Sequence, residues 1–336
     1  MTLVVAKYFK RIKNNNVQCT LCPNYCIIKD RQYGKCLVRK NFEGTLYSEA
    51  YSNLCAINID PIEKKPLFHF LAGTKTLSIA FGGCNLKCLN CQNFSISQSK
   101  PTNVEQYIYN PNELVNLAKE KKLQSISYTY TEPLVSYEYT YDTAFIAKEK
   151  GIKNILVTAG YINEEPLFEL LPLIDAANID IKSFDEKTYS EINQAKLSSV
   201  LNTILIFKKY NVWIELTYLL IPNINDNEKM IDKFASWLIS NNLNKVPIHI
   251  SRFFPNYKLN YIEPTSVISI EFVVTYLKSK GILYVYSGNL NSNVYENTFC
   301  PNCNRIIISR LGFFIKEFNI ENNKCKFCNL YIDGFF

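Results

Sequence analysis

The chain has 336 residues, of which 47% are hydrophobic, and its formal net charge is +7. This length and composition exclude an intrinsically disordered protein and indicate one large domain or two domains with appendages. No apolar run is long enough to cross a bilayer, and the opening residues MTLVVAKYFKRIKNNN lack a signal segment, so we expect a cytoplasmic protein without a membrane partner. The basic residues are scattered apart from a dense group over 7–13, which favours a solvated face over a nucleic-acid partner.

Cysteine is the most informative residue type, because all but one of the 12 cysteines fall into three groups. Spacings of the C-x2-C kind in a long intracellular chain indicate metal binding rather than disulfides, since the compartment is reducing and a large core needs no covalent staples. The sequence therefore predicts three metal sites. The groups are Cys19, Cys22, Cys26 and Cys36; Cys84, Cys88 and Cys91; and Cys300, Cys303, Cys325 and Cys328, with Cys55 standing alone.

Residues 1–72 contain the first cysteine group and only short alternating pieces, which predicts a small cysteine-rich lobe stapled by metal. The spacing C-x2-C-x3-C-x9-C fits structural zinc or an auxiliary iron–sulfur cluster. Zinc is slightly favoured, because no ferredoxin spacing is present. A site that uses only some of the four cysteines is a third alternative.

Residues 73–297 alternate between strand-like runs and amphipathic helices, which predicts an α/β fold. Helix ends are readable at Asn110 and Pro111, a cap and first helical residue, and at Gly151 and Gly281, which suit left-handed caps. Repeated strand–helix units without hairpin turns favour parallel strands, a barrel or partial barrel, and chemistry at the carboxyl ends of the strands. The predicted strands are 76–81, 125–130, 154–159, 176–182, 212–220, 246–253 and 282–287.

The stretch FGGCNLKCLNCQNFSISQ places three cysteines, spaced C-x3-C-x2-C, directly after the first of these strands. Gly82 and Gly83 allow the chain to turn sharply out of the strand. A cubane cluster has four irons, so three thiolates leave one iron without a protein ligand. The alternative is a zinc site completed by a distant ligand such as Cys55.

The loop, the strand before it and the repeats after it resemble the radical S-adenosylmethionine (radical SAM) superfamily. Longer stretches are similar to the AmmeMemoRadiSam-system radical SAM enzymes, relatives of the pyruvate formate-lyase activating enzyme; they include CTLCPNYC, DPIEKKPLFHF, TYTEP, ANIDIKSF and HISRFFP. The resemblance implies a partial (β/α) TIM-like barrel of the radical SAM type. It also implies that Cys84, Cys88 and Cys91 bind a 4Fe–4S cluster whose open iron is chelated by S-adenosylmethionine (SAM).

The activity that this resemblance implies is that of an oxidoreductase of the activating-enzyme kind. In the superfamily the reduced cluster cleaves SAM to methionine and a 5′-deoxyadenosyl radical, which abstracts hydrogen from a protein or small-molecule substrate. Glycyl-radical activation is one such reaction. The implied electron donor is a low-potential protein of the ferredoxin or flavodoxin type.

The resemblance also implies which residues contact SAM. Glu132, in TYTEP, stands where the superfamily receives the amino group. Asp180 and Lys182, in ANIDIKSF, are similar to the DLK element of the activating enzymes and would meet the ribose hydroxyls and the methionine carboxylate. Thr158 in LVTAGY and His249 in HISRFFP are further candidates, and a purely structural role is the alternative for His249.

Four positions depart from the resemblance, and two of them, Thr131 and Ala159, stand where the family usually has asparagines. Asn90 stands where the superfamily commonly has an aromatic residue near the adenine, and Phe94 replaces the family's usual tryptophan. We therefore expect the adenine contact to differ in this chain, with Phe94 as the candidate substitute for the missing ring.

Residues 298–336 are too few for another strand–helix unit and carry two C-x2-C pairs. This spacing is typical of a zinc ribbon, in which four thiolates close a tetrahedral site. With no open position the site is expected to be structural, and metal binding would contribute much of the folding free energy of the module. Iron in a rubredoxin-like site is the alternative.

A different class of function also deserves a test. Two terminal modules of zinc type and a basic charge balance suit a zinc-stabilised protein that binds nucleic acid or other proteins without catalysis. That hypothesis leaves the three-cysteine loop unexplained. The sequence therefore favours the enzyme.

Overall fold

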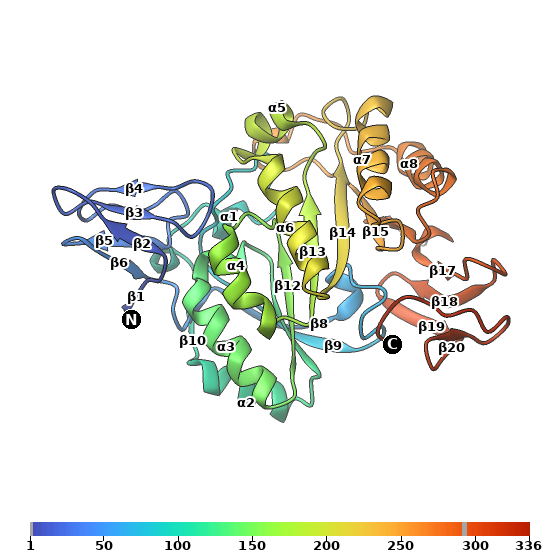
Figure 1. The fold of residues 1–336 in the computed structure, drawn as a ribbon, viewed down its shortest axis with the longest axis horizontal. Helices are drawn as coiled ribbons and strands as arrows, with labels where there is room; N and C mark the ends of the chain where they lie inside the picture. Colours follow the sequence, from blue (N-terminus) through green and yellow to red (C-terminus); the bar gives the residue numbers. More distant parts are fainter. Residues whose placement is uncertain (1–2, 291–293) are drawn as a thin grey trace.

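The computed structural model describes residues 3–290 and 294–336, and its centre is a mixed eight-stranded sheet (Figure 1). The strands are β8 (Ala56–Pro61), β9 (Lys75–Ala80), β11 (Ser125–Tyr128), β12 (Lys153–Thr158), β13 (Ala176–Ile181), β14 (Trp213–Leu220), β15 (Ile248–Arg252) and β16 (Val285–Gly288). Their order across the sheet is β16-β15-β14-β13-β12-β11-β9-β8. The strands from β9 to β16 are parallel, and β8 runs antiparallel to β9.

The predicted α/β class is confirmed by this sheet, and every predicted strand occurs with ends shifted by at most three residues. Between the described strands β8 and β16 there is no pairing, so the sheet is open rather than a closed barrel. β8 belongs to the range 1–72 that the sequence assigns to the N-terminal lobe, yet it is an edge strand of the central sheet.

Helices connect successive strands and cover one face of the sheet (Figure 1). Within the described residues no helix is both long and apolar enough to cross a bilayer. The longer helices are α2 (Pro111–Glu120), α3 (Tyr137–Glu149), α4 (Glu164–Leu170), α6 (Leu197–Lys209), α7 (Glu228–Ser240) and α8 (Val267–Ser279), and the shorter ones are α1 (Phe94–Ser97) and α5 (Glu186–Thr188).

The helix ends follow the local sequence. The Asn110 side chain accepts a hydrogen bond from the Glu113 N–H at 3.0 Å, and the Glu113 carboxylate accepts one from the Asn110 N–H at 2.8 Å. This reciprocal pair is the predicted capping box of α2. Gly151 and Gly281 follow α3 and α8 with φ angles of +72° and +91°, the left-handed conformation that glycine adopts without strain.

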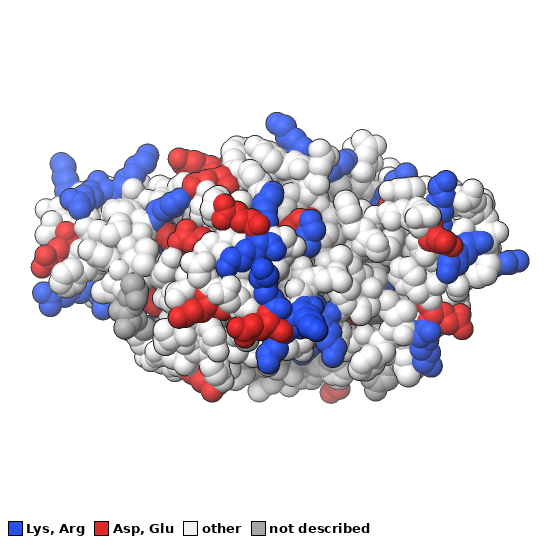
Figure 2. All heavy atoms as spheres, turned by 90° about the horizontal axis from the view of Figure 1, so that it is seen from below, with Lys and Arg blue, Asp and Glu red and all other residues white. Residues whose placement is uncertain are grey.

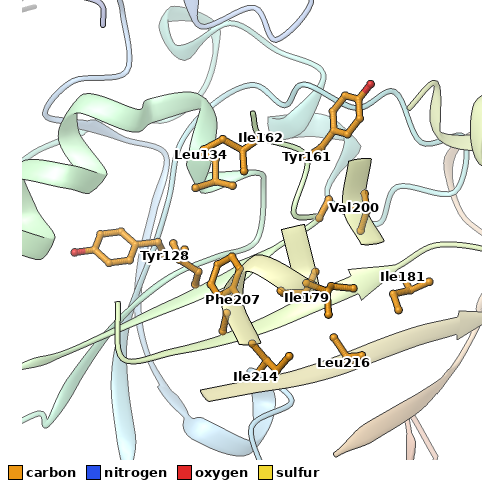
Figure 3. Packing of buried hydrophobic residues seen from close by; sticks show 14 of the residues in the cluster. Tyr128, Leu134, Tyr161, Ile162, Ile179, Ile181, Val200, Phe207, Ile214 and Leu216 are labelled. Atoms are coloured by element: carbon orange, nitrogen blue, oxygen red, sulfur yellow. The ribbon is translucent and has the colours of Figure 1, made fainter. Parts of the chain in front are cut away.

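Apolar side chains from helices and strands fill the space between the two layers. Phe207 and Val200 of α6 lie beside Ile179 of β13 and Ile214 of β14, and all four are at most 4% exposed (Figure 3). Burying one such side chain contributes roughly 1.5–3 kcal/mol, so this layer supplies a large share of the folding free energy. The packing holds the strands in register and thereby places their carboxyl ends together.

The N-terminal lobe consists of two small sheets at one end of the molecule (Figure 1). A buried ion pair joins the lobe to α3, because the Arg39 guanidinium binds the Glu138 carboxylate and both side chains are at most 5% exposed. Arg39 also donates a hydrogen bond to the Lys7 carbonyl at 2.7 Å. The strands are β1 (Val4–Val5), β2 (Phe9–Arg11), β3 (Val17–Cys19), β4 (Ile27–Ile28), β5 (Arg39–Phe42) and β6 (Thr45–Ser48), while β7 (Asn53–Leu54) pairs with β10 (Tyr107–Ile108).

The C-terminal module lies at the opposite end and packs against the segment before β9 (Figure 1). The Phe335 N–H donates to the His69 carbonyl, and the Leu71 N–H donates to the Phe335 carbonyl, each at 2.7 Å. The Arg310 guanidinium lies 4.1 Å from the centre of the Phe68 ring. The strands are β17 (Thr298–Phe299), β18 (Ile306–Leu311), β19 (Phe314–Phe318), β20 (Ile320–Glu321) and β21 (Lys324–Cys325).

A directional chain of hydrogen bonds links this module to β16 through a buried histidine. His69 Nδ1 lies 2.6 Å from the Asp333 carbonyl, which can only accept, so Nδ1 carries the proton. Nε2 then accepts from the Tyr286 hydroxyl at 2.5 Å. Tyr286 accepts from Thr298 at 3.0 Å, and Thr298 accepts from Arg310 at 2.8 Å. From Arg310 through Thr298, Tyr286 and His69 to Asp333, each group donates a hydrogen bond to the next. A second proton on the His69 ring would occupy Nε2 and remove the acceptor for the Tyr286 hydroxyl.

We expect this chain to make stability depend on pH. Burial lowers the pKa of His69 to about 4, whereas an unfolded histidine has a pKa of about 6.5. Between pH 4 and pH 6.5 the unfolded state therefore binds more protons than the folded state. The contribution of neutral His69 to the free energy of unfolding is fully present above pH 6.5 and is lost as the pH falls toward 4. The free energy of unfolding in urea should fall by about 2 kcal/mol between pH 7 and pH 5 on account of His69.

The matched variant is His69→Gln, whose amide can both donate and accept but does not titrate. Its unfolding free energy should change less between pH 7 and pH 5 than that of the parent chain. The chain has only two histidines, so NMR can follow each imidazole. A His69 ring that titrates near pH 6.5 in the folded protein would contradict the assignment.

Candidate active site

The three-cysteine loop begins where β9 ends, and two glycines set its course. Gly83 has a φ angle of +95°, and a Cβ atom there would lie 2.4 Å from the Cys36 carbonyl oxygen. A Cβ atom on Gly82 would lie 2.9 Å from Pro101 Cα. No larger residue fits at either position without moving backbone. The turn brings the Cys84 N–H within 3.1 Å of the Cys36 carbonyl, so the loop rests directly on the N-terminal lobe.

The loop opens onto a cavity of about 910 Å³ at the carboxyl ends of the strands. Side chains from four different strand ends reach this cavity together with the three cysteines. Parallel strands place their carboxyl ends at one edge, which explains how residues distant in sequence converge there. The residues predicted from the sequence that line it are Cys84, Cys88, Cys91, Glu132, Thr158, Asp180, Lys182 and His249.

Each of the three sulfur atoms has a polar neighbour. Cys84 Sγ accepts from the Leu86 N–H at 3.4 Å, Cys88 Sγ accepts from the Asn193 side-chain amide at 3.2 Å, and Cys91 Sγ lies 3.1 Å from the Ser97 hydroxyl. Burial raises the pKa of Cys84 and of Cys88. These thiols lose their protons readily only where a cation compensates the charge, and a metal supplies that compensation.

The Glu132 carboxylate is held rigidly at the cavity wall. It accepts hydrogen bonds from the Thr158 hydroxyl at 2.7 Å, the Ala159 N–H at 2.8 Å and the Leu134 N–H at 3.1 Å. Burial raises the pKa of Glu132, and these three hydrogen bonds oppose that shift. Thr158 therefore positions Glu132, and the carboxylate faces the cavity in a single orientation.

Asp180 and Lys182 leave β13 on the same side, as their spacing predicts. Lys182 Nζ lies 2.6 Å from Asp180 Oδ2. Burial alone would lower the pKa of Lys182, but the Asp180 carboxylate and the nearby Cys88 raise it above its usual range. Lys182 is therefore a permanent cation between the cysteine loop and the strand ends.

His249 is positioned by a residue that sequence reasoning missed. His249 Nε2 lies 2.7 Å from Glu215 Oε2, and Glu215 is fully buried. Glu215 also accepts hydrogen bonds from the Phe68 and His69 N–H groups at 2.9 and 2.8 Å. Burial alone would raise the pKa of Glu215, but His249 and these donors hold it below its usual range. The signal was present, because Glu215 is the only charged residue in the strand WIELTYLL.

Asn193 is a second residue that the sequence did not single out. It lies in a π-helical turn, Tyr189–Asn193, and its side chain donates to Cys88 Sγ. Asn193 is buried, but nothing in the local sequence distinguishes it from the other asparagines of the chain. Only the packing of this turn against the cysteine loop, through the Lys87 and Leu89 N–H groups, reveals its position.

Several other sequence candidates lie outside the described cavity wall. Phe94 stacks on Tyr257 with ring centres 4.8 Å apart, so it does not supply the ring missing at Asn90. The Asn90 side chain is 7% exposed, and its Oδ1 has no partner among the described residues. Cys55 is buried and does not line the cavity, which removes it as a fourth ligand for the loop.

The C-terminal cysteines converge closely. Their four Sγ atoms all lie within 4.8 Å of one another, with 3.5 Å between Cys300 and Cys328 and 3.8 Å between Cys303 and Cys325. Tetrahedral zinc with Zn–S bonds of about 2.3 Å places its sulfur atoms about 3.8 Å apart. Among the described residues this is the one group of three or more potential ligands close enough to hold a single metal ion.

The family model described as Radical SAM superfamily matches residues 78–235. The chain is 43% identical to the Uncharacterized protein MJ0808 of Methanocaldococcus jannaschii, over 98% of each chain. It is 26% identical to the pyruvate formate-lyase-activating enzyme of Clostridium pasteurianum, over 56% of this chain and 81% of the relative. A solved domain of pyruvate-formate lyase-activating enzyme from Bacteroides vulgatus matches at 18% identity and a TM-score of 0.42, over 48% of this chain and 98% of the domain.

We expect loss of the Glu215 carboxylate to destabilise the fold. The Glu215→Ala change leaves two backbone N–H groups and the His249 ring without their acceptor, so the unfolding free energy should fall by about 3–5 kcal/mol. Glu215→Gln keeps one acceptor oxygen and should cost less. Urea denaturation measures both, with the exposed Glu191→Ala as control. Equal stability of Glu215→Ala and the parent chain would contradict the assigned role.

Proposed function

Because this chain belongs to the radical SAM superfamily, we propose that Cys84, Cys88 and Cys91 hold a 4Fe–4S cluster and that the cavity beside them binds SAM. When bound, such a cluster supplies the electron for reductive cleavage of SAM, the chemistry that starts hydrogen abstraction from a substrate. One observation carries the proposal: three cysteines of a single loop share one cavity with polar residues from four strand ends. The donor set fits, since three thiolates of one loop bind three irons of a cubane and leave the fourth iron open.

The charges of the strand-end residues suggest their roles toward SAM. Glu132 would receive the amino group, because an ammonium compensates the charge of a buried carboxylate. Lys182 would bind the methionine carboxylate, and Asp180 would accept the ribose hydroxyls. The two side chains form an ion pair, and both line the cavity. Thr158 acts through Glu132, and His249, held by Glu215, completes the wall.

The cavity has room for more than SAM. Its volume of about 910 Å³ lies near the upper end of the range for ligand sites, roughly 300–1,000 Å³. The lining also includes Lys64, Lys65, Tyr130 and Phe254, which are not assigned to SAM. The Clostridium pasteurianum relative is named for the activation of pyruvate formate-lyase, which is a protein, so we propose a protein substrate for this chain. Transfer of a glycine-centred radical signal to a copurifying partner would support this class.

Two further partners complete the proposal. A low-potential electron donor of the ferredoxin or flavodoxin type would reduce the cluster. The C-terminal cysteines would hold zinc in a ribbon-like module over 298–336, with iron as the alternative metal, because the sulfur separations match a tetrahedral thiolate site. All four ligand positions are filled by protein, so this metal would be structural.

Membership of the radical SAM superfamily argues against a zinc-stabilised binding protein without catalysis. The charge distribution agrees, because Figure 2 shows Lys and Arg intermixed with Asp and Glu over the middle of the visible face. A nucleic-acid-binding surface gathers basic residues on one face. We therefore propose no nucleic-acid partner.

The central test is SAM cleavage by anaerobically reconstituted protein. After addition of iron and sulfide, and then dithionite and SAM, the parent chain should release 5′-deoxyadenosine. The Cys84→Ala variant should release none, because two thiolates and a methyl group do not hold the cluster. The matched control is Cys55→Ala, a buried cysteine outside the three groups, which should keep the activity.

A second variant separates the cluster from the SAM contacts. Glu132→Gln should retain its iron and its visible absorption but bind SAM about tenfold to a hundredfold more weakly, the loss of one charged hydrogen bond. Turnover by Cys84→Ala, or a parent chain that forms no brown chromophore and cleaves no SAM, would overturn the proposed function.

Removal of the C-terminal metal should unfold only its module. Purified protein should contain about one zinc per chain, and Cys303→Ser should lose it. Hydrogen exchange over 298–336 should then rise, while exchange in β11 to β14 stays unchanged. A variant that loses its metal without any change in exchange would show that the site is not structural.

A further inference from the structure

The four N-terminal cysteines converge on a second, smaller cavity. Cys19, Cys22, Cys26 and Cys36 all line it, although they come from two loops and a strand of the lobe. The remaining wall is largely apolar, with Leu21, Ile28 and Val135 among its members. Four thiols around one cavity suit a metal site, because four cysteines together supply a complete set of thiolate ligands.

The spacing of these sulfur atoms differs from that of the C-terminal group. The C-terminal Sγ atoms all lie within 4.8 Å of one another, whereas no three N-terminal thiols of the described chain approach closely enough to hold a single metal ion. In a cubane each thiolate binds a different iron, so the sulfur atoms stand farther apart than around one zinc. The C-terminal group therefore shows the sulfur separations of a site for one metal ion in this chain. The N-terminal group does not have these separations.

The surroundings suit a multi-iron cluster. The Lys35 N–H donates to Cys26 Sγ at 3.4 Å, and Arg39 Nη1 donates to Cys19 Sγ at 3.6 Å. Hydrogen bonds to the sulfur atoms and buried charge are the means by which proteins adjust cluster potentials. A Cβ atom on Gly34 would lie 3.8 Å from Cys36 Sγ and 3.1 Å from Ile28 Cδ1, so glycine keeps the cavity open.

This cavity adjoins the three-cysteine loop. The Cys84 N–H donates to the Cys36 carbonyl at 3.1 Å, and the Asn24 side-chain amide donates to the Asn85 carbonyl at 2.8 Å. Asn85 lines the N-terminal cavity, while its neighbour Cys84 lines the large one. A single loop therefore separates the two thiol groups. Cys26 is partly exposed beside Tyr25, so the N-terminal site also reaches the surface.

We propose that Cys19, Cys22, Cys26 and Cys36 hold a second 4Fe–4S cluster, which passes electrons to the cluster on the Cys84 loop. The second part rests on the function proposed above. An external low-potential protein donor gives one electron to the N-terminal cluster and is oxidised; that electron then reduces the loop cluster. No bond or proton changes place in either transfer.

Metal analysis of the full chain tests the site. The variant with Cys84→Ala, Cys88→Ala and Cys91→Ala should retain about four irons and four sulfides after anaerobic reconstitution, against about eight of each in the parent chain. It should also show the EPR signal of a reduced cluster after dithionite treatment. The matched variant carries Cys19→Ser, Cys22→Ser, Cys26→Ser and Cys36→Ser and should retain about four irons on the loop.

The outcomes separate this inference from the proposed function. If the alanine variant holds no iron and two zinc ions, the N-terminal site is zinc and the inference is overturned, while iron in the serine variant still supports the loop cluster. If the alanine variant keeps iron and the serine variant has none, the second site stands and the loop cluster fails. Should the serine variant be insoluble, the alanine variant decides alone, because its N-terminal site is intact.

Electron transfer from the N-terminal cluster to the loop cluster can be tested by a separate rate measurement. Reduced flavodoxin should reduce the loop cluster more slowly in the serine variant than in the parent chain, as followed by loss of visible absorption. Dithionite, a small reductant that enters the cavity, should reduce both to the same final extent. Equal rates with flavodoxin would overturn the relay.

Discussion

One buried carboxylate ties the separate parts of this molecule together. Glu215 is the third residue of β14, is fully buried, and accepts hydrogen bonds from Phe68, His69 and His249. A charge in this position is costly unless every partner is in place. Three parts of the fold therefore depend on one another. The segment before β9 must pack against β14, β15 must pair with β14 in register, and the hydrogen-bonded chain through His69 must reach the C-terminal module. Two of the partners of Glu215, Phe68 and His249, line the large cavity.

The three cysteine groups show how ligand number and spacing divide metal sites within one chain. The C-terminal group has four thiols at the separations of a single tetrahedral ion, which suits a closed structural site. The loop after β9 has three thiols at the edge of a large cavity, which leaves a coordination position for a ligand. The N-terminal group has four thiols around one cavity, and no three of these described thiols lie close enough together to hold a single metal ion. The number of thiols indicates whether a metal site keeps an open coordination position. The distance between the thiols indicates whether the site holds one metal ion or several.

Much of this arrangement could be predicted before any coordinates. The strand boundaries, the Asn110 capping box and the glycine caps follow from periodicity and local chemistry, which act within a few residues. The common edge of the strands follows from parallel pairing, so Glu132, Asp180 and Lys182 could be expected near the cysteine loop. Asn193 could not be assigned, because its partner Cys88 lies 105 residues away in sequence. Glu215 could have been singled out as the one charged residue of its strand, but the sequence does not identify His249 as its partner.

The sequence by itself determined the spacing of each cysteine group, the positions of the strands along the chain and the identity of the strand-end residues. Each of these features depends only on residues that are close together in the sequence. It left open whether the N-terminal cysteines suit zinc or a cluster, since spacing along a chain does not specify distance in space. Tertiary structure decided that the sulfur atoms stand apart, that Phe94 stacks on Tyr257 instead of facing the cavity, and that Cys84 rests on Cys36. The physical reason is that packing fixes distances between segments whose sequences carry no record of each other.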